Sequence, residues 1–253
     1  MTDSVRAAAL LLDMDGTLVD SRAVVERLWL RWAQGHGLDP ERVLAVIHGR
    51  QGQESMAELL PDRPHALNLA ENELLLAAET AETDGVVAIA GAATLLAALT
   101  GPPALPHALV TSATLALATA RMDAAGLPMP RLVVSAADVA ASKPHPEGFL
   151  TAARLLGVDA ADCIVVEDSA NGIAAGLAAG MRVIGVGPHA AALRSVATGA
   201  PGSAAALWAV ATGAPGSAAL RAAAAGAAPT WTVADCTGIR VVPDAGAIAV
   251  TIG

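Results

Sequence analysis

The chain has 253 residues, enough for one sizeable domain or for a domain with a small insert. Its net charge of −9 excludes the basic surface that nucleic-acid binding needs. Hydrophobic residues make up 54% of the chain, yet many are alanines, and no uninterrupted apolar stretch of about 18 residues suggests a membrane span. Two cysteines and no signal-peptide pattern predict a cytoplasmic protein without membrane or nucleic-acid partners.

The first third of the chain predicts one strand followed by a block of helices. Residues 7–12 form an apolar run typical of a buried strand. From Ser21 to about Ala88 the apolar residues recur with helical spacing, and Asp39-Pro40-Glu41 has the pattern of a helix start. We expect four helices here, which form an inserted helical cap at residues 20–88.

From Gly91 onward, helices alternate with short apolar strands. We expect strands at 108–110, 132–134, 164–166 and 182–186, and helices at 92–99, 114–125, 146–156 and 171–179. This alternation predicts an α/β fold with a doubly wound parallel sheet, formed by residues 1–19 and 89–253. Ligands of such sheets bind beyond the carboxyl ends of the strands.

The C-terminal part contains a repeat and two further short strands. The segment that begins at Ala197 recurs at Ala211, and its composition predicts a flexible insert at about 190–230. Two copies are too few for a repeat architecture. Residues 231–233 and 247–251 are expected to complete the sheet or its edge.

The most informative stretch is Asp13-Met14-Asp15-Gly16-Thr17, directly after the first strand. Side chains two residues apart in a strand share a face, and two close carboxylates repel unless a cation or proton lies between them. Taken alone, the stretch also fits an Asp-Gly turn. Carboxylates together with phosphate oxygens are the ligands that Mg²⁺ prefers, so the stretch favours a magnesium site.

Three further motifs follow expected strands: Thr111-Ser112, Ser142-Lys143-Pro144 and Glu167-Asp168-Ser169. Each alone fits a helix start or a solvated surface residue. Together and in this order, the four motifs resemble those of the haloacid dehalogenase superfamily, in its phosphatase and phosphomutase branch. The resemblance extends from about residue 8 to residue 188.

This resemblance implies a role for each motif. Asp13 is the nucleophile that forms an aspartyl-phosphate, and Asp15 is the general acid and base. Mg²⁺ is the implied cofactor, held by the Asp13 carboxylate, the Asp15 backbone carbonyl and Asp168, with Glu167 beside it. Thr111, Ser112 and Lys143 bind phosphate. A loop of the cap, His48-Gly49-Arg50, reads the substrate.

The expected function is that of a magnesium-dependent phosphatase, a monomer or weak homo-oligomer, acting on a small sugar or polyol phosphate. A β-phosphoglucomutase is an alternative with the same four motifs, but such mutases carry a histidine where Val25 stands here. A non-catalytic phosphate-binding protein is a second alternative. It would be expected to lack Asp13 or Asp15, and both are present.

Overall fold

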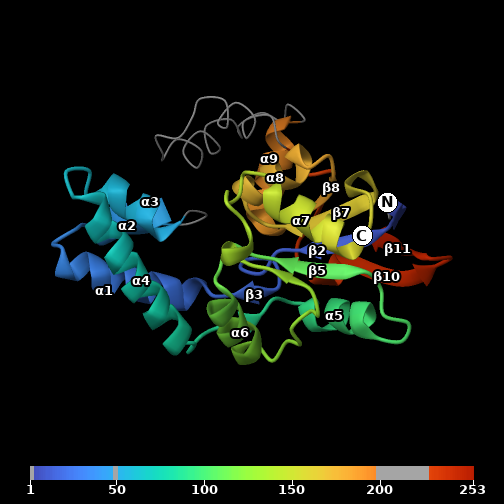
Figure 1. Ribbon diagram of the computed structural model, residues 1–253, viewed down its shortest axis with the longest axis horizontal. Coiled ribbons are helices and arrows are strands. Elements are labelled where there is room, and N and C mark those ends of the chain that lie inside the picture. The colour runs from blue at the N-terminus through green and yellow to red at the C-terminus, as the bar shows by residue number, and fades with distance from the viewer. Residues whose placement is uncertain (1–2, 48–50, 198–227) are drawn as a thin grey trace.

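The computed structural model describes residues 3–47, 51–197 and 228–253. Its central element is a six-stranded parallel sheet with the strand order β6-β5-β2-β7-β8-β9 (Figure 1). The strands are β2 (Ala9–Leu12), β5 (His107–Val110), β6 (Val133–Val134), β7 (Cys163–Glu167), β8 (Arg182–Val186) and β9 (Trp231–Val233). The expected α/β fold with a doubly wound parallel sheet is confirmed.

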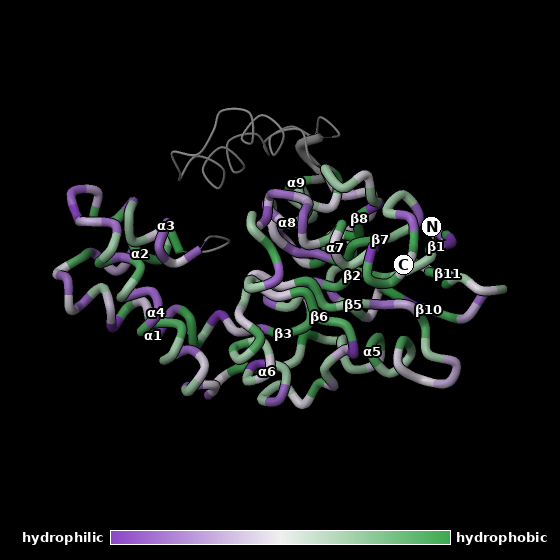
Figure 2. The backbone as a smooth tube through the Cα atoms, in the orientation of Figure 1, coloured by the Kyte–Doolittle hydropathy of each residue, from purple (hydrophilic) through white to green (hydrophobic). Residues whose placement is uncertain are grey.

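Helices cover both faces of this sheet, and the central strand β2 shows why. All four of its residues are buried, and they alternate between two apolar clusters. Leu10 and Leu12 face α5 (Ala92–Thr100) and α6 (Leu115–Ala124), while Ala9 and Leu11 face α7 (Glu147–Leu156), α8 (Ala170–Ala178) and α9 (Gly187–Ala197). Figure 2 shows that the strands of the sheet are formed largely by hydrophobic residues.

Four helices separate β2 from the rest of the sheet in the sequence. They are α1 (Arg22–Gly35), α2 (Pro40–Ile47), α3 (Gly52–Leu59) and α4 (His65–Ala81), and they lie to one side of the sheet (Figure 1). We call residues 22–81 the cap. Two short strands, β3 (Val19–Asp20) and β4 (Val87–Ala88), pair antiparallel where the chain enters and leaves it. Trp29 is buried in the interior of the cap.

The two ends of the described chain form a second sheet that the sequence did not predict. The strand expected at residues 7–12 is β2, and a further strand that was not expected, β1 (Asp3–Ala7), precedes it. β1 pairs antiparallel with β11 (Ala247–Ile252), which also pairs with β10 (Ile239–Asp244). The expectation that β11 completes the main sheet is therefore wrong. β11 alternates buried and partly buried residues, as an antiparallel strand with one covered face does, whereas every residue of the parallel strand β7 is buried.

The repeat that begins at Ala197 lies almost wholly outside the described residues. Within the described part of the chain, no helix combines the length and apolar character required to cross a membrane.

Candidate active site

The loop after β2 is a tight turn that brings its backbone against the end of β7. The Asp13 N–H donates to the Val166 carbonyl at 3.0 Å, and the Met14 carbonyl accepts the N–H of Leu18 at 2.8 Å. Gly16 has a φ of +85°, and a Cβ at this position would lie 2.8 Å from Asp168 Oδ1 and closer still to other atoms of that carboxylate. Only glycine combines this backbone angle with so close an approach.

Three carboxylates from the ends of β2 and β7 converge beside this turn. Each of Asp13, Glu167 and Asp168 offers one oxygen within 4.8 Å of the others. Burial raises the pKa of Asp13 to about 7, Lys143 opposes this effect, and Glu167 raises the pKa further. Burial, followed by the charges of Glu167 and Asp13, also raises the pKa of Asp168 well above its usual value. These oxygen donors with excess negative charge fit a hard divalent cation such as Mg²⁺.

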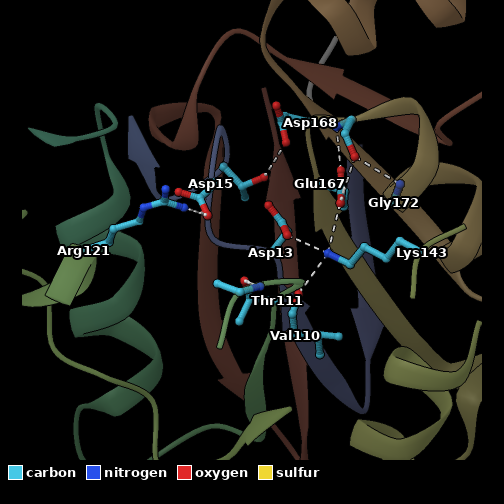
Figure 3. A network of polar contacts seen from close by, with 12 residues as sticks. Asp13, Asp15, Val110, Thr111, Arg121, Lys143, Glu167, Asp168 and Gly172 are labelled. Atoms are coloured by element: carbon cyan, nitrogen blue, oxygen red, sulfur yellow. Dashed lines mark hydrogen bonds and ion pairs between the residues drawn. The ribbon is translucent and has the colours of Figure 1, made fainter. Parts of the chain in front are cut away.

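A buried lysine lies against the same carboxylates (Figure 3). Lys143 Nζ donates to Asp13 Oδ1 at 2.5 Å, to the Val110 carbonyl at 2.9 Å and to Glu167 Oε1 at 3.1 Å. Burial disfavours the ammonium, but the charges of Asp13 and Glu167 outweigh it and raise the pKa of Lys143. Its Nζ also lies 5.1 Å from the centre of the Phe149 ring. Lys143 is therefore a fixed positive charge beside Asp13.

The hydroxyl groups after β5 lie near this lysine. Thr111 is buried, and its Oγ1 accepts the N–H of Ala113 at 3.1 Å, which leaves the hydroxyl proton free to be donated elsewhere. Ser112 is exposed. Thr111, Ser112 and Lys143 line one small concavity together with Ser142. The structure therefore brings together the three residues that the sequence assigned to phosphate binding.

The carboxylate of Asp15 is directed elsewhere. β2 ends at Leu12, so strand alternation does not place Asp15 on the face of Asp13. Among the described residues, the group of carboxylates that could hold a metal is Asp13, Glu167 and Asp168, without the Asp15 side chain. Ser21 Oγ donates to Asp15 Oδ1 at 2.6 Å, and Arg121 Nη1 donates to Asp15 Oδ2 at 2.7 Å (Figure 3).

Sequence reasoning missed Arg121 and its second partner. Arg121 Nη2 donates to Glu79 Oε2 of α4 at 2.5 Å, and both side chains are buried. A signal was present, because Arg121 follows Leu117 and Ala118 by four and three residues, on the apolar face of α6. A charged residue on such a face indicates a buried partner.

The cap residues His48, Gly49 and Arg50 lie outside the described residues. Their neighbour Gln51 is described, and its Nε2 donates to Ser142 Oγ, one residue before Lys143. The cap therefore contacts the loop of the core that carries Lys143.

The fold and the site together define the class of this protein. Acidic residues and a buried lysine lie at the ends of the parallel strands, and a helical segment lies beside them. The chain is an α/β protein with a doubly wound, Rossmann-like parallel sheet, of the kind that binds ligands beyond the carboxyl ends of its strands. Residues 7–180 match the model of the haloacid dehalogenase-like hydrolases, and the chain belongs to that family, as the motifs predicted.

Named relatives support this assignment. The chain is 44% identical to hexitol phosphatase A of Escherichia coli over 72% of this chain and 84% of that one. It is 30% identical to glycerol-1-phosphate phosphohydrolase 2 of Saccharomyces cerevisiae over 72% and 76% of the two chains. Among solved structures, a haloacid dehalogenase family hydrolase from Deinococcus radiodurans, with bound phosphate and sodium, superposes with a TM-score of 0.59 at 26% identity, covering 91% of this chain and 92% of the other.

Proposed function

We propose that the protein is a magnesium-dependent phosphatase that hydrolyses a small sugar or polyol phosphate through an aspartyl-phosphate. The observation that carries this proposal is the buried pair of Asp13 and Lys143 at 2.5 Å, with Glu167 and Asp168 beside it. The printed names of two relatives, a hexitol phosphatase and a glycerol-1-phosphate phosphohydrolase, support the substrate class.

Asp13 is the proposed nucleophile because its carboxylate is fixed at the carboxyl end of the central strand. Its backbone is tied to β7, and Lys143 holds one of its oxygens, so the other is free to attack phosphorus. Lys143 and the free hydroxyl proton of Thr111 are placed to hold the oxygens of the phosphoryl group. Phosphoryl transfer depends mainly on such positioning and charge neutralisation.

Asp15 is the proposed general acid toward the departing alkoxide and the base toward the hydrolytic water. An alkoxide is a poor leaving group, so a proton delivered to its oxygen lowers the barrier substantially. In the described arrangement the Asp15 carboxylate is engaged by Ser21 and Arg121. It must turn from these partners to reach the leaving oxygen.

Asp13, Asp168 and the Asp15 carbonyl would hold the cation, with Glu167 beside them. When bound, Mg²⁺ supplies positive charge that offsets the repulsion among these carboxylates and the charge of the phosphoryl group. Burial, followed by repulsion from the neighbouring carboxylates, raises the pKa values of Asp13 and Asp168, and a bound cation would favour their ionised forms. Glu167 is held in turn by the N–H of Ser169 at 2.5 Å and by its hydroxyl at 3.2 Å.

A cytoplasmic location is part of the same proposal. Cys163 and Cys236 are both buried and unpaired, which fits a reducing compartment.

The direct test is phosphate release from a panel of hexitol, glycerol and aldose monophosphates, with Mg²⁺ and with a chelator. We expect turnover of at least one polyol or sugar phosphate, lost on chelation and lost in Asp13→Asn. Phosphorus NMR of the products with β-glucose 1-phosphate separates hydrolysis from isomerisation. Conversion to glucose 6-phosphate without free phosphate would establish the mutase alternative instead.

A further inference from the structure

Arg121 joins the core to the cap because it pairs with two carboxylates, one from the core and one from the cap. Its Nη1 contacts Asp15 in the loop after β2, and its Nη2 contacts Glu79 near the end of α4. The Arg121 side chain is only 6% exposed and that of Glu79 only 8%. α4 packs against α6 at this point, so the two ion pairs lie inside the contact between cap and core.

The charges in this group do not balance, and this makes the two contacts compete. One guanidinium faces two carboxylates, and burial, together with the charge of Asp15, raises the pKa of Glu79 even though Arg121 opposes the shift. Within the described residues, the third guanidinium nitrogen that could donate, Nε of Arg121, has no hydrogen-bond partner. A buried guanidinium that loses one carboxylate therefore has to rely more strongly on the other.

The other Asp15 oxygen is held at the opposite boundary of the cap. Ser21, which donates to it at 2.6 Å, is the residue immediately before α1. The Asp15 carboxylate is thus held from two sides. Ser21 lies where the chain enters the cap, and Arg121 pairs with Glu79 near the point where the chain leaves it.

We infer that Arg121 is a positioning residue that couples the direction of the Asp15 carboxylate to the seating of the cap. The inference rests on the proposed role of Asp15 as general acid. When the cap is packed against the core, Glu79 pairs with the Arg121 guanidinium, and this weakens the contact between Arg121 and Asp15. When α4 moves away, Asp15 becomes the remaining partner, and the guanidinium holds it away from the phosphate site.

A kinetic cycle tests this coupling with wild type, Glu79→Gln, Arg121→Gln and the double variant. Glu79→Gln leaves the guanidinium to Asp15, so kcat for sorbitol 6-phosphate should fall roughly five- to tenfold with a smaller change in KM. In the Arg121→Gln background the same substitution should change kcat by less than about twofold, since the coupling has already been removed. Glu82→Gln is the matched control, because Glu82 is exposed and pairs with Arg31 instead.

The leaving group separates positioning of an acid from general damage. p-Nitrophenolate departs without a proton, so the first-turnover release from p-nitrophenyl phosphate should be unchanged in Glu79→Gln. Equal losses on both substrates, or equal effects of Glu79→Gln in both backgrounds, would overturn the inference. A wild-type protein without phosphatase activity would contradict the proposed function. Whether Arg121 couples Asp15 to the cap is then tested by a second measurement that does not depend on activity.

That measurement uses the reciprocity of coupled equilibria. If cap seating affects Asp15, then Asp15→Asn must affect cap seating by releasing Arg121 to Glu79. Nitroxides on cysteines that replace exposed Leu69 of α4 and Leu155 of α7 report the distance between cap and core.

We expect Asp15→Asn to narrow the distance distribution and Arg121→Gln to broaden it. Asp20→Asn should leave it unchanged, since Asp20 is exposed and its side chain accepts from the Arg22 N–H. A distribution unaffected by both Asp15→Asn and Arg121→Gln would refute the coupling, whatever the activity of the wild type.

Discussion

Gly172→Ala should destabilise the protein, although the same change in most helices is favourable. Gly172 lies in the first turn of α8, where alanine ordinarily gains up to about 1 kcal/mol over glycine. Here the added Cβ would lie 2.6 Å from Glu167 Oε2 and would overlap the rest of that carboxylate. Glu167 is 1% exposed, so it cannot turn into solvent without leaving its partners.

The magnitude follows from the contacts that Glu167 would lose. Overpacking a buried site costs about 1–3 kcal/mol, and a hydrogen bond to a charged group contributes about 1.5–3 kcal/mol. Glu167 accepts from Ser169 and from Lys143, and one of these contacts must break. After subtracting the helix gain, we expect the free energy of unfolding to fall by about 2–4 kcal/mol.

Urea denaturation without metal measures this loss, and a Mg²⁺ titration followed by thermal unfolding measures its effect on the site. We expect a Mg²⁺ affinity reduced at least about tenfold, because Glu167 lies beside the proposed ligands Asp13 and Asp168. Gly35→Ala in α1 is the control, since a Cβ there meets no atom within 4 Å. Wild-type stability and Mg²⁺ affinity in Gly172→Ala would refute the reasoning about Glu167.

Three further outcomes are expected. Asp13→Asn should lower kcat by several orders of magnitude with the fold retained by circular dichroism, and a residual rate above about a tenth of wild type would exclude the aspartyl-phosphate route. Burial raises the pKa of Asp13 from 3.8 to about 7. Between these two pH values the metal-free folded state therefore binds more protons than the unfolded state, so the free energy of unfolding falls as the pH rises through this range. The rise in Tm on adding Mg²⁺ should therefore be larger at about pH 8 than at about pH 6, and an equal rise would contradict the cluster as the binding site. Deleting one copy of the repeat, from Ala197 to the residue before Ala211, should change kcat little because loop length enters stability only logarithmically, and a large loss in a folded variant would assign the segment a role in the site.

The sequence predicted those parts of the site that depend on local pattern. Thr111, Lys143 and Asp168 each follow a short apolar strand, and parallel strands bring their carboxyl ends to one edge of the sheet. The order of strands and helices along the chain was therefore sufficient to predict that these residues lie close together.

The contacts it missed join elements far apart in the chain. Arg121 pairs with Glu79 across 42 positions and with Asp15 across 106, and no periodic pattern encodes which buried charges meet. The second sheet was missed for a similar reason. β1 and β11 pair from opposite ends of the chain, and β10 contains Arg240 and Pro243, which weaken its strand pattern.

The antiparallel pairing of β3 with β4 makes the cap an exchangeable module. Val19 lies opposite Ala88 and Asp20 opposite Val87, so the chain leaves the core and returns to it at almost the same point. Any inserted segment whose ends lie about 5 Å apart could begin and end there without altering the order of the parallel strands. Such a graft has one chemical condition, because Arg121 belongs to the core and would remain buried without Glu79. A transplanted cap must bring a carboxylate to this position, or the arginine must be replaced with it.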